Sequence, residues 1–280
     1  MDAGPAVSDA GHSGHDAGHG GNDAGPGGGE DAGGGGGGTV KLEFISIPAG
    51  SYVLSHELVR DSGLVFPADT TVTLRAFSLQ KTPVTVGQFE QCVAAGACTS
   101  SHYTTYDPQS LDRVLCNYDC TGDCGEGNIK DHPMNCVDLE GANEYCKWIG
   151  GRLPTEDEWE YAATHNGTRH LDTKYPWGDS KPDATRANFN NCVTTEVGTY
   201  SPAGDSPLGL VDMSGNVSEW TDTLYQLGFP ERMDKGGDAS ATYEDYCDES
   251  CEDSLKITDH HGVGCYPSFK HRGLGFRCVK

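Results

Sequence analysis

Two cysteines near the C-terminus, Cys247 and Cys251, are separated only by acidic and small residues, in the stretch GGDASATYEDYCDESC that spans residues 236–251. Two neighbouring thiolates could bind Cu(I), a soft ion that prefers sulfur ligands, or act as a redox pair. A reactive thiol needs a lowered pKa, which a nearby cation or a helix N-terminus provides. No Lys, Arg or His lies between Lys235 and Lys256, and acidic residues flank both cysteines. The local charge therefore favours disulfide-bonded cysteines over a reactive pair.

The chain contains twelve cysteines, all between Cys92 and Cys278. An even, high number in one domain indicates a disulfide framework and an oxidising compartment. Zinc is the alternative, but the paired Cys-x-x-Cys knuckles of structural zinc sites do not occur in the sequence. Cys92 and Cys98 could close a local loop, and Cys116 and Cys136 bracket a longer one. The residues alone leave the pairing of the other eight cysteines open: Cys120, Cys124, Cys146, Cys192, Cys247, Cys251, Cys265 and Cys278.

A second candidate site consists of oxygen-bearing residues around a glycine turn, in the stretch DMSGNVSE. It contains Asp212, Ser214, Asn216 and Glu219. Calcium takes about six to eight oxygen ligands, which combine carboxylates with backbone carbonyls. The alternative is a polar turn whose side chains form hydrogen bonds with one another.

The elements that position these residues are few. Alternating apolar residues predict strands at Val40–Phe44 and Thr71–Leu79. After residue 165, Gly, Pro, Asn and Asp predominate, which indicates long loops and short strands. We therefore expect a mixed α+β domain that is rich in loops. Capping signals predict the starts of three helices, which are Thr85 with Gln88, Asp138 for a helix through Lys147, and Thr155 with Glu158.

Composition divides the chain into two parts. Residues 1–38 contain no Lys, Arg or aromatic residue and repeat Asp-Ala-Gly, so they cannot bury enough apolar surface to fold, and we interpret them as a disordered tether. Residues 39–280 can form one domain, which we expect to be a monomer. The formal net charge of −23 argues against binding to nucleic acid or to anionic membranes.

Cysteine usage and the tether together predict an extracytoplasmic protein, either secreted, periplasmic or a surface lipoprotein. No apolar run reaches the roughly 18 residues that a membrane-spanning helix needs. We expect that an export segment ending in a lipid-anchored cysteine preceded the tether, so contact with a membrane would occur only through that anchor.

The sequence resembles the formylglycine-generating enzyme, or sulfatase-modifying factor, family across residues 40–280. The resemblance rests on six blocks in the same order: KTPVTVGQFEQC (81–92), HPMNCVDLEGANEYCKWIGGRLPTEDEWEYAA (132–163), YPWGD (175–179), PLGLVDMSGNVSEWT (207–221), KGG (235–237) and GLGFRC (273–278). It implies a loop-rich fold related to C-type lectins. It also implies an oxidase that converts a cysteine of a client protein to formylglycine with oxygen and copper(I).

The catalytic strand of that family departs from its pattern here. Where the first catalytic cysteine is expected, four residues after Gly237, the chain has Ala241. Asp238 replaces the usual serine and Ser218 a tryptophan, so Cys247 and Cys251 would be a rearranged pair. We therefore weigh two functions, a catalytically silent domain that binds a peptide, a glycan or a partner protein, and a copper-dependent oxidase.

The resemblance also implies structural features. It implies a disulfide between Cys146 and Cys278, and a calcium site formed by Asp212, Asn216, Glu219 and the carbonyl of Ser214. It implies a second calcium site that begins at Asn188 and Phe189, although the acidic loop that would complete this site is shortened. Because the resemblance at the glycine turn holds residue by residue, we favour structural calcium there over a polar turn.

Overall fold

The computed structural model describes residues 42–54, 58–59, 65–106, 116–118, 120, 129–191, 193–239, 254–258 and 265–280. The expected tether lies outside these residues, as do Cys124, Cys192, Cys247 and Cys251. None of the helices within the described ranges has the length and apolar character that a membrane crossing requires.

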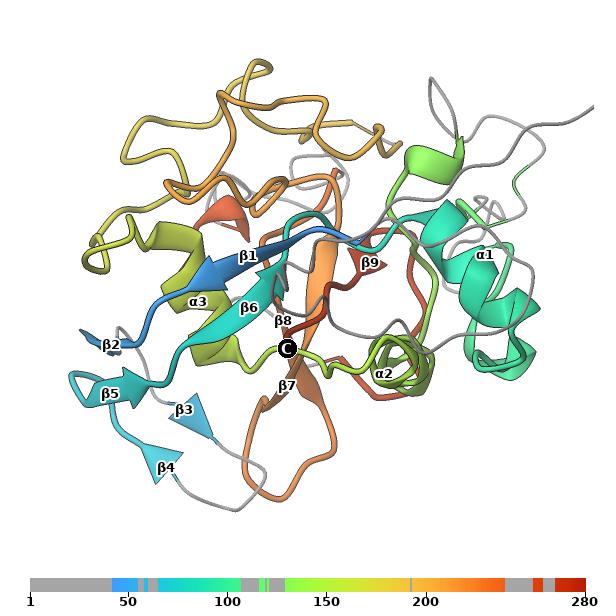
Figure 1. Ribbon diagram of the computed structural model, residues 1–280, viewed down its shortest axis with the longest axis horizontal. Helices are drawn as coiled ribbons and strands as arrows, with labels where there is room; N and C mark the ends of the chain where they lie inside the picture. Colours follow the sequence, from blue (N-terminus) through green and yellow to red (C-terminus); the bar gives the residue numbers. More distant parts are fainter. Residues whose placement is uncertain are drawn as a thin grey trace, which may run out of the picture. The chain divides into compact units, whose positions relative to one another are not determined.

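Two small antiparallel ladders form the N-terminal part of the domain (Figure 1). The strand expected at Thr71–Leu79 is divided in two, because its halves pair with different partners. The strand expected at Val40–Phe44 is displaced, since among the described residues β1 begins at Phe44 and continues to the fully buried Ile47. The two ladders pair β1 (Phe44–Ile47) with β6 (Phe77–Gln80) and β2 (Gly50–Val53) with β5 (Thr71–Leu74).

The three helices begin where the capping signals predict. Thr85 Oγ1 accepts a hydrogen bond from Gln88 N at 3.2 Å, and Gln88 Oε1 accepts one from Thr85 N at 3.1 Å. Asp138 caps the second helix by accepting from Gly141 N at 3.0 Å. The helices are α1 (Val86–Ala94), α2 (Leu139–Trp148) and α3 (Glu156–Thr164), with single 3-10 turns η1 (Ser100–His102) and η2 (Ile129–Asp131).

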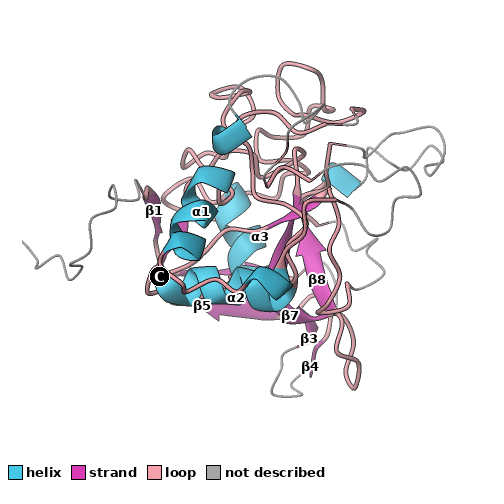
Figure 2. Ribbon diagram, turned by 90° about the vertical axis from the view of Figure 1, so that its right-hand side faces the viewer, coloured by secondary structure: helices cyan, strands magenta, loops and turns pink. Residues whose placement is uncertain are grey.

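The largest sheet combines segments that are far apart in the sequence. Its order is β4-β3-β7-β8, and β9 lies parallel to β7 with Ser218 opposite Leu274. Figure 2 shows β3, β4, β7 and β8 to one side of the three helices. The strands are β3 (Leu58–Val59), β4 (Val65–Phe66), β7 (Ser218–Leu224), β8 (Arg232–Lys235) and β9 (Leu274–Gly275).

A buried lysine joins this sheet to α3. Lys235, on β8, is fully buried, and its Nζ lies 2.7 Å from Glu160 Oε1 and 3.3 Å from Glu156 Oε1 on α3. Burial alone would lower the pKa of Lys235, but the two carboxylates outweigh this effect and raise it. The lysine therefore stays charged, and the ion pair fixes the helix against the sheet.

Between α3 and β7 the described residues contain no helix or strand, as the sequence predicts. The core has two parts. One gathers side chains of α1 and α2 around Phe276, and the other packs the N-terminal ladders against Trp159 of α3. The loops therefore cover a core that the helices and strands build.

Three expected disulfides are present. Cys92–Cys98 closes the end of α1 over six residues, and Cys116–Cys136 spans 20. Cys146–Cys278 spans 132 residues and links α2 to the C-terminal segment. This segment is also hydrogen-bonded to β6, because Gln80 N donates to Cys278 O. Cys120 is disulfide-bonded as well.

The lengths of the loops that they close predict that two of these disulfides contribute unequally to the free energy of unfolding. A disulfide stabilises mainly by restricting the unfolded chain, so removing Cys146–Cys278 should cost about 5 kcal/mol and removing Cys92–Cys98 about 2 kcal/mol. The double alanine variants C146A/C278A and C92A/C98A are a matched pair, because all four cysteines are buried. Urea unfolding measures the difference. Equal losses in the two variants would contradict the chain-entropy account.

Candidate functional site

The candidate calcium residue Glu219 lies in a fully buried ion pair. Arg277 Nη2 donates to Glu219 Oε1 at 2.7 Å, and Arg277 Nε donates to Glu219 Oε2 at 2.7 Å. Trp159 Nε1 donates to the same Oε2 at 2.9 Å. Glu219 is 1% exposed and Arg277 0% exposed, so the surrounding protein supplies every partner.

Arg277 also binds the chain that precedes Glu219. Its Nη2 donates to the carbonyl oxygens of Val211 at 2.8 Å and Asp212 at 3.3 Å, and its Nη1 to those of Gln80 and Lys81. A single guanidinium thus connects the C-terminal segment, the end of β6 and the glycine turn.

Three residues of the glycine turn have left-handed backbone angles. Asp212, Gly215 and Asn216 have left-handed φ angles of 52°, 83° and 70°. A Cβ on Gly215 would lie 2.5 Å from the carbonyl oxygen of Asn188, so only glycine permits this approach. The turn therefore brings the backbone of residues 188 and 215 together.

Three of the expected calcium residues form one hydrogen-bonded group. Asn216 Oδ1 accepts from Asn188 Nδ2 at 3.2 Å and from Thr195 N at 2.9 Å, while Asn216 N donates to Asn188 O. Asp212 Oδ2 accepts from Gly198 N at 2.9 Å and from Asn216 Nδ2 at 3.5 Å. Asp212, Asn188 and Asn216 are thus brought together.

The fit to calcium differs among the expected ligands. Burial raises the pKa of Asp212 to about 6, and a cation beside this carboxylate would relieve that cost. Asp212 can therefore supply a carboxylate oxygen, together with the carbonyl of Ser214, whose hydroxyl donates to Leu255 O. Asn216 could supply Oδ1 only by exchanging the hydrogen bonds that it accepts from Asn188 Nδ2 and Thr195 N. Glu219 does not fit, because Arg277 and Trp159 already occupy its oxygens. Phe189 is half-buried beside Asn188.

A second polar group lies at the end of β8, where the resemblance places catalysis. Cys265 Sγ lies 3.6 Å from Asp234 Oδ1, and it is the free thiol among the described cysteines. Burial, reinforced by Asp234, raises the pKa of this thiol. Burial likewise raises the pKa of Asp234, and Asp238 adds to the effect. The thiol therefore stays protonated at neutral pH.

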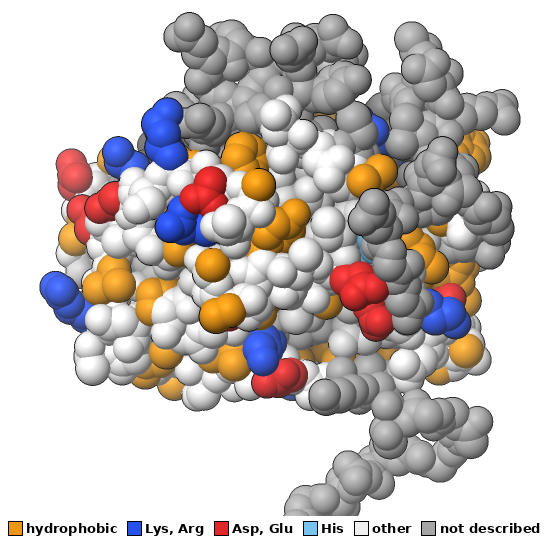
Figure 3. Space-filling model, turned by 90° about the horizontal axis from the view of Figure 1, so that it is seen from above, with side chains coloured by type: hydrophobic (Ala, Val, Ile, Leu, Met, Phe, Trp, Pro, Cys, Tyr) orange, Lys and Arg blue, Asp and Glu red, His pale blue; other side chains and the backbone are white. Residues whose placement is uncertain are grey.

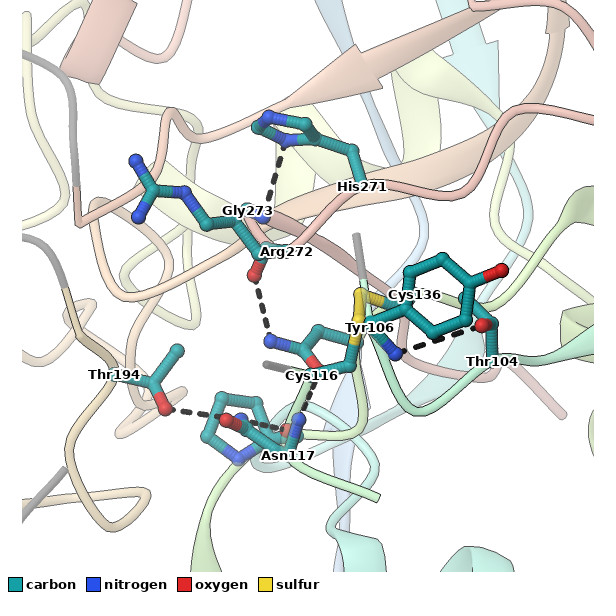
Figure 4. The surroundings of a disulfide bond; sticks show 11 residues. Thr104, Tyr106, Cys116, Asn117, Cys136, Thr194, His271, Arg272 and Gly273 are labelled. Carbon is teal, nitrogen blue, oxygen red and sulfur yellow. Dashed lines mark hydrogen bonds between the residues drawn. A yellow bond between two sulfur atoms is a disulfide. The ribbon is translucent and has the colours of Figure 1, made fainter. Parts of the chain in front are cut away.

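The Cys116–Cys136 disulfide adjoins a network of buried amides (Figure 4). Asn117 Nδ2 donates to Thr194 Oγ1 at 2.9 Å, and Asn117 N donates to Asn135 Oδ1 at 2.8 Å. Asn135 Nδ2 donates to Arg272 O at 2.6 Å. Since Thr195 bonds to Asn216, this network continues into the glycine turn.

Sequence reasoning found the turn but missed its main partners. Cys247 and Cys251 lie outside the described residues, so their role stays a prediction. Arg277 was visible only as one letter of GLGFRC, and Trp159 only as an apolar helix residue. A buried basic residue near the end of the chain gives no local signal, because its partner is 58 residues away.

Comparison with known proteins identifies a family. The domain described as "Sulfatase-modifying factor enzyme 1-like domain" matches residues 39–280. The formylglycine-generating enzyme of Mycobacterium tuberculosis is 29% identical over 307 aligned residues, which cover 85% of this chain and 97% of that protein. The inactive C-alpha-formylglycine-generating enzyme 2 of Mus musculus is 35% identical over 52% of this chain and 48% of its own length.

Other matches are partial or structural. A Chlamydia pneumoniae protein named serine/threonine-protein kinase pkn1 is 38% identical over 55% of this chain, and the matched part spans only 25% of that protein. The structure of PvdO from Pseudomonas aeruginosa aligns with a TM-score of 0.59 and 19% identity, over 84% of this chain and 93% of that chain. At this identity the likeness shows the fold alone.

The buried Arg277–Glu219 pair should be essential for stability. Replacing Arg277 by Met would leave Glu219 buried without its cation, which should cost about 3–5 kcal/mol. Arg152 is the matched control, because it also pairs with a glutamate, Glu158, but its side chain is 52% exposed. Arg152→Met should cost about 1 kcal/mol or less. Chemical denaturation measures both, and similar losses would refute the dominant role of the buried pair.

The buried Asp212 predicts a pH effect. Because its pKa is raised in the folded state, the stability that its proton contributes is complete below about pH 4 and lost as pH rises through 6. In EDTA, Asp212→Asn should therefore gain about 3 kcal/mol relative to the unmodified protein between pH 4 and pH 7. Asparagine tolerates the left-handed φ of this position. If the difference in unfolding free energy between the two proteins did not change with pH, burial would not raise the pKa of Asp212.

Proposed function

Because the chain belongs to the sulfatase-modifying factor family, we propose that it is an exported, catalytically silent member that binds a peptide, a glycan or a partner protein. Its fold is the loop-rich, disulfide-bonded α+β fold of formylglycine-generating enzymes. Calcium would stabilise its binding surface through Asp212, Asn216 and the carbonyl of Ser214.

The observation that carries this proposal is the acidic end of β8. Copper(I) binding requires deprotonated thiols, yet Cys265 faces the buried Asp234 and keeps its proton. The sequence that follows β8 has Ala241 in place of a cysteine and acidic residues around Cys247 and Cys251. Both features oppose thiolate chemistry at this end of the strand.

Three features are compatible with an exported, catalytically silent protein. Seven described cysteines are in disulfides, which form and persist in oxidising compartments. Among the described residues visible in Figure 3, basic, acidic and apolar side chains are interspersed. The mouse relative is itself named inactive, so a silent member would have a precedent.

The alternative function is a copper-dependent oxidase that converts a cysteine of a client protein to formylglycine. It is favoured by the match to the Mycobacterium tuberculosis enzyme, which extends over 97% of that protein. In this case Cys247 and Cys251 would be the copper ligands, displaced along the chain.

Copper binding and oxygen consumption distinguish the two functions. The protein is made in an oxidising compartment and titrated with Cu(I) against a competing chelator, and oxygen uptake is followed with a cysteine-containing peptide. We expect no stoichiometric copper binding and no peptide oxidation. The matched variants are C247S/C251S and C265S. Copper-dependent oxidation of the peptide that C247S/C251S abolishes and C265S retains would establish the oxidase instead.

Calcium is tested separately by thermal unfolding at neutral pH. Calcium added after EDTA treatment should raise the melting temperature of the unmodified protein and leave that of Asp212→Asn unchanged. Binding stabilises the folded state in proportion to the logarithm of free ligand over Kd, so the shift should grow with calcium concentration. No shift in either protein would leave the group as a polar turn.

A further inference from the structure

A tight exposed turn follows α3 in the segment HNGTRH, residues 165–170. His165 pairs with His170 in an antiparallel bridge, and Asn166 N donates to Arg169 O at 3.1 Å. The segment contains the only Asn-Gly pair of the chain, Asn166 and Gly167. The turn is therefore a fixed structure that holds a chemically unusual dipeptide at the surface.

The side-chain carbonyl of Asn166 accepts hydrogen bonds from three donors. They are Thr168 Oγ1 at 2.8 Å, Thr168 N at 3.0 Å and Arg169 N at 3.0 Å. Donors that converge on one carbonyl oxygen polarise it, and they stabilise the negative charge that develops when its carbon is attacked. The Asn166 amide is thus arranged as an electrophile.

The backbone amide of Gly167 lies beside a base. Gly167 N donates to His165 Nδ1 at 2.9 Å. A backbone N–H can only donate, so Nδ1 carries a lone pair and the ring proton resides on Nε2. Burial lowers the pKa of His165, which keeps the imidazole neutral and able to accept a proton at neutral pH.

Packing holds this base in place. His165 is 2% exposed, and its ring lies 4.8 Å from that of Tyr161, centroid to centroid. Tyr161 in turn stacks on His170, at the other end of the turn, with ring centroids 6.0 Å apart. The base and the turn are therefore anchored on α3, whereas residues 166–169 are exposed to water.

We propose that Asn166 is a self-modifying site, at which the folded chain converts its own asparagine to aspartate and isoaspartate through a succinimide. Gly167 N is the nucleophile, His165 is the base, and the donors from Thr168 and Arg169 stabilise the oxyanion. Water is the only co-reactant.

The atoms of the reaction balance. His165 Nδ1 takes the proton of Gly167 N, the nitrogen forms a bond to Asn166 Cγ, and the carbonyl electrons move onto Oδ1. When the carbonyl re-forms, the Cγ–Nδ2 bond breaks and the amino group takes the proton from His165 to leave as ammonia. Water then adds to either carbonyl of the succinimide and opens it to aspartate or isoaspartate.

Glycine at position 167 permits this chemistry. Its φ of +92° lies in the left-handed region, where side chains are disfavoured, and the absence of a Cβ leaves its nitrogen open to approach.

The two products of the reaction have different effects on the turn. Aspartate adds a charge next to Arg169, whereas isoaspartate inserts a methylene into the main chain, which breaks the turn.

Asn216 is an internal control within the same molecule. Its Oδ1 also accepts hydrogen bonds, here from two donors, Asn188 Nδ2 and Thr195 N. However, Val217 N, the corresponding nucleophile, donates to Gly215 O rather than to a base, and Asn216 is 1% exposed. The same digest should therefore show Asn216 unchanged.

The experiment compares the folded protein with a synthetic peptide of residues 163–171. Both are incubated in neutral buffer, and the loss of asparagine at position 166 is followed by peptide mapping and mass spectrometry. Digestion in heavy-oxygen water labels any product that forms during handling. A positioned base and oxyanion donors should make the folded protein react about tenfold faster than the peptide.

Three variants test the roles of the residues. Thr168→Val removes one donor from an exposed position and should slow the reaction several-fold, while Asn166→Gln should abolish it. His165→Gln removes the base, and its melting temperature is recorded to show that the turn still folds. A folded protein that reacts more slowly than the peptide would overturn the proposal, because the turn would then protect the asparagine. An unchanged rate in Thr168→Val would overturn the oxyanion role.

Discussion

The buried Arg277–Glu219 pair is the interaction on which the arrangement of the domain depends. A guanidinium has five N–H donors and cannot be neutralised at any relevant pH, so burying it requires an acceptor for nearly every N–H. The protein provides them from Glu219 and from four backbone carbonyls, on β6, at its end and in the glycine turn. Three segments that have no sequence proximity are thereby held in one geometry.

The same demand shapes the candidate sites. Because Glu219 is taken by Arg277 and Trp159, the oxygens left for a cation come from Asp212, Asn216 and the backbone. Asp212 is a buried carboxylate, and the side chain of Arg277 pairs with Glu219 instead. The raised pKa of Asp212 and the proposal that it binds calcium both follow from this arrangement. On β8, Lys235 meets Glu156 and Glu160 on α3, so the strand that leads to the candidate catalytic segment is also held by buried charge.

Acidic surroundings recur wherever a thiol is free or a cysteine pair is expected to react. Asp234 faces Cys265, and the sequence around Cys247 and Cys251 is acidic. A field of this sign favours thiols and disulfides over thiolates, which suits a domain held by covalent cross-links better than one that binds copper(I). By contrast, the imidazole of His165, whose pKa burial lowers, accepts a hydrogen bond from Gly167 N just outside the sequence blocks that carry the family resemblance.

The sequence by itself determined the local features: the capping residues Thr85, Asp138 and Thr155 fixed the starts of the helices, because a cap acts over three residues. It also identified the family and the glycine turn, whose residues are contiguous. Only the tertiary structure decided what each charge faces. The sequence predicts Glu219 as a calcium ligand, but in the structure it pairs with Arg277, 58 residues away. The strand expected at Thr71–Leu79 is divided in two, because its halves pair with different strands. Long-range pairing of charges and strands depends on packing, which no local pattern encodes.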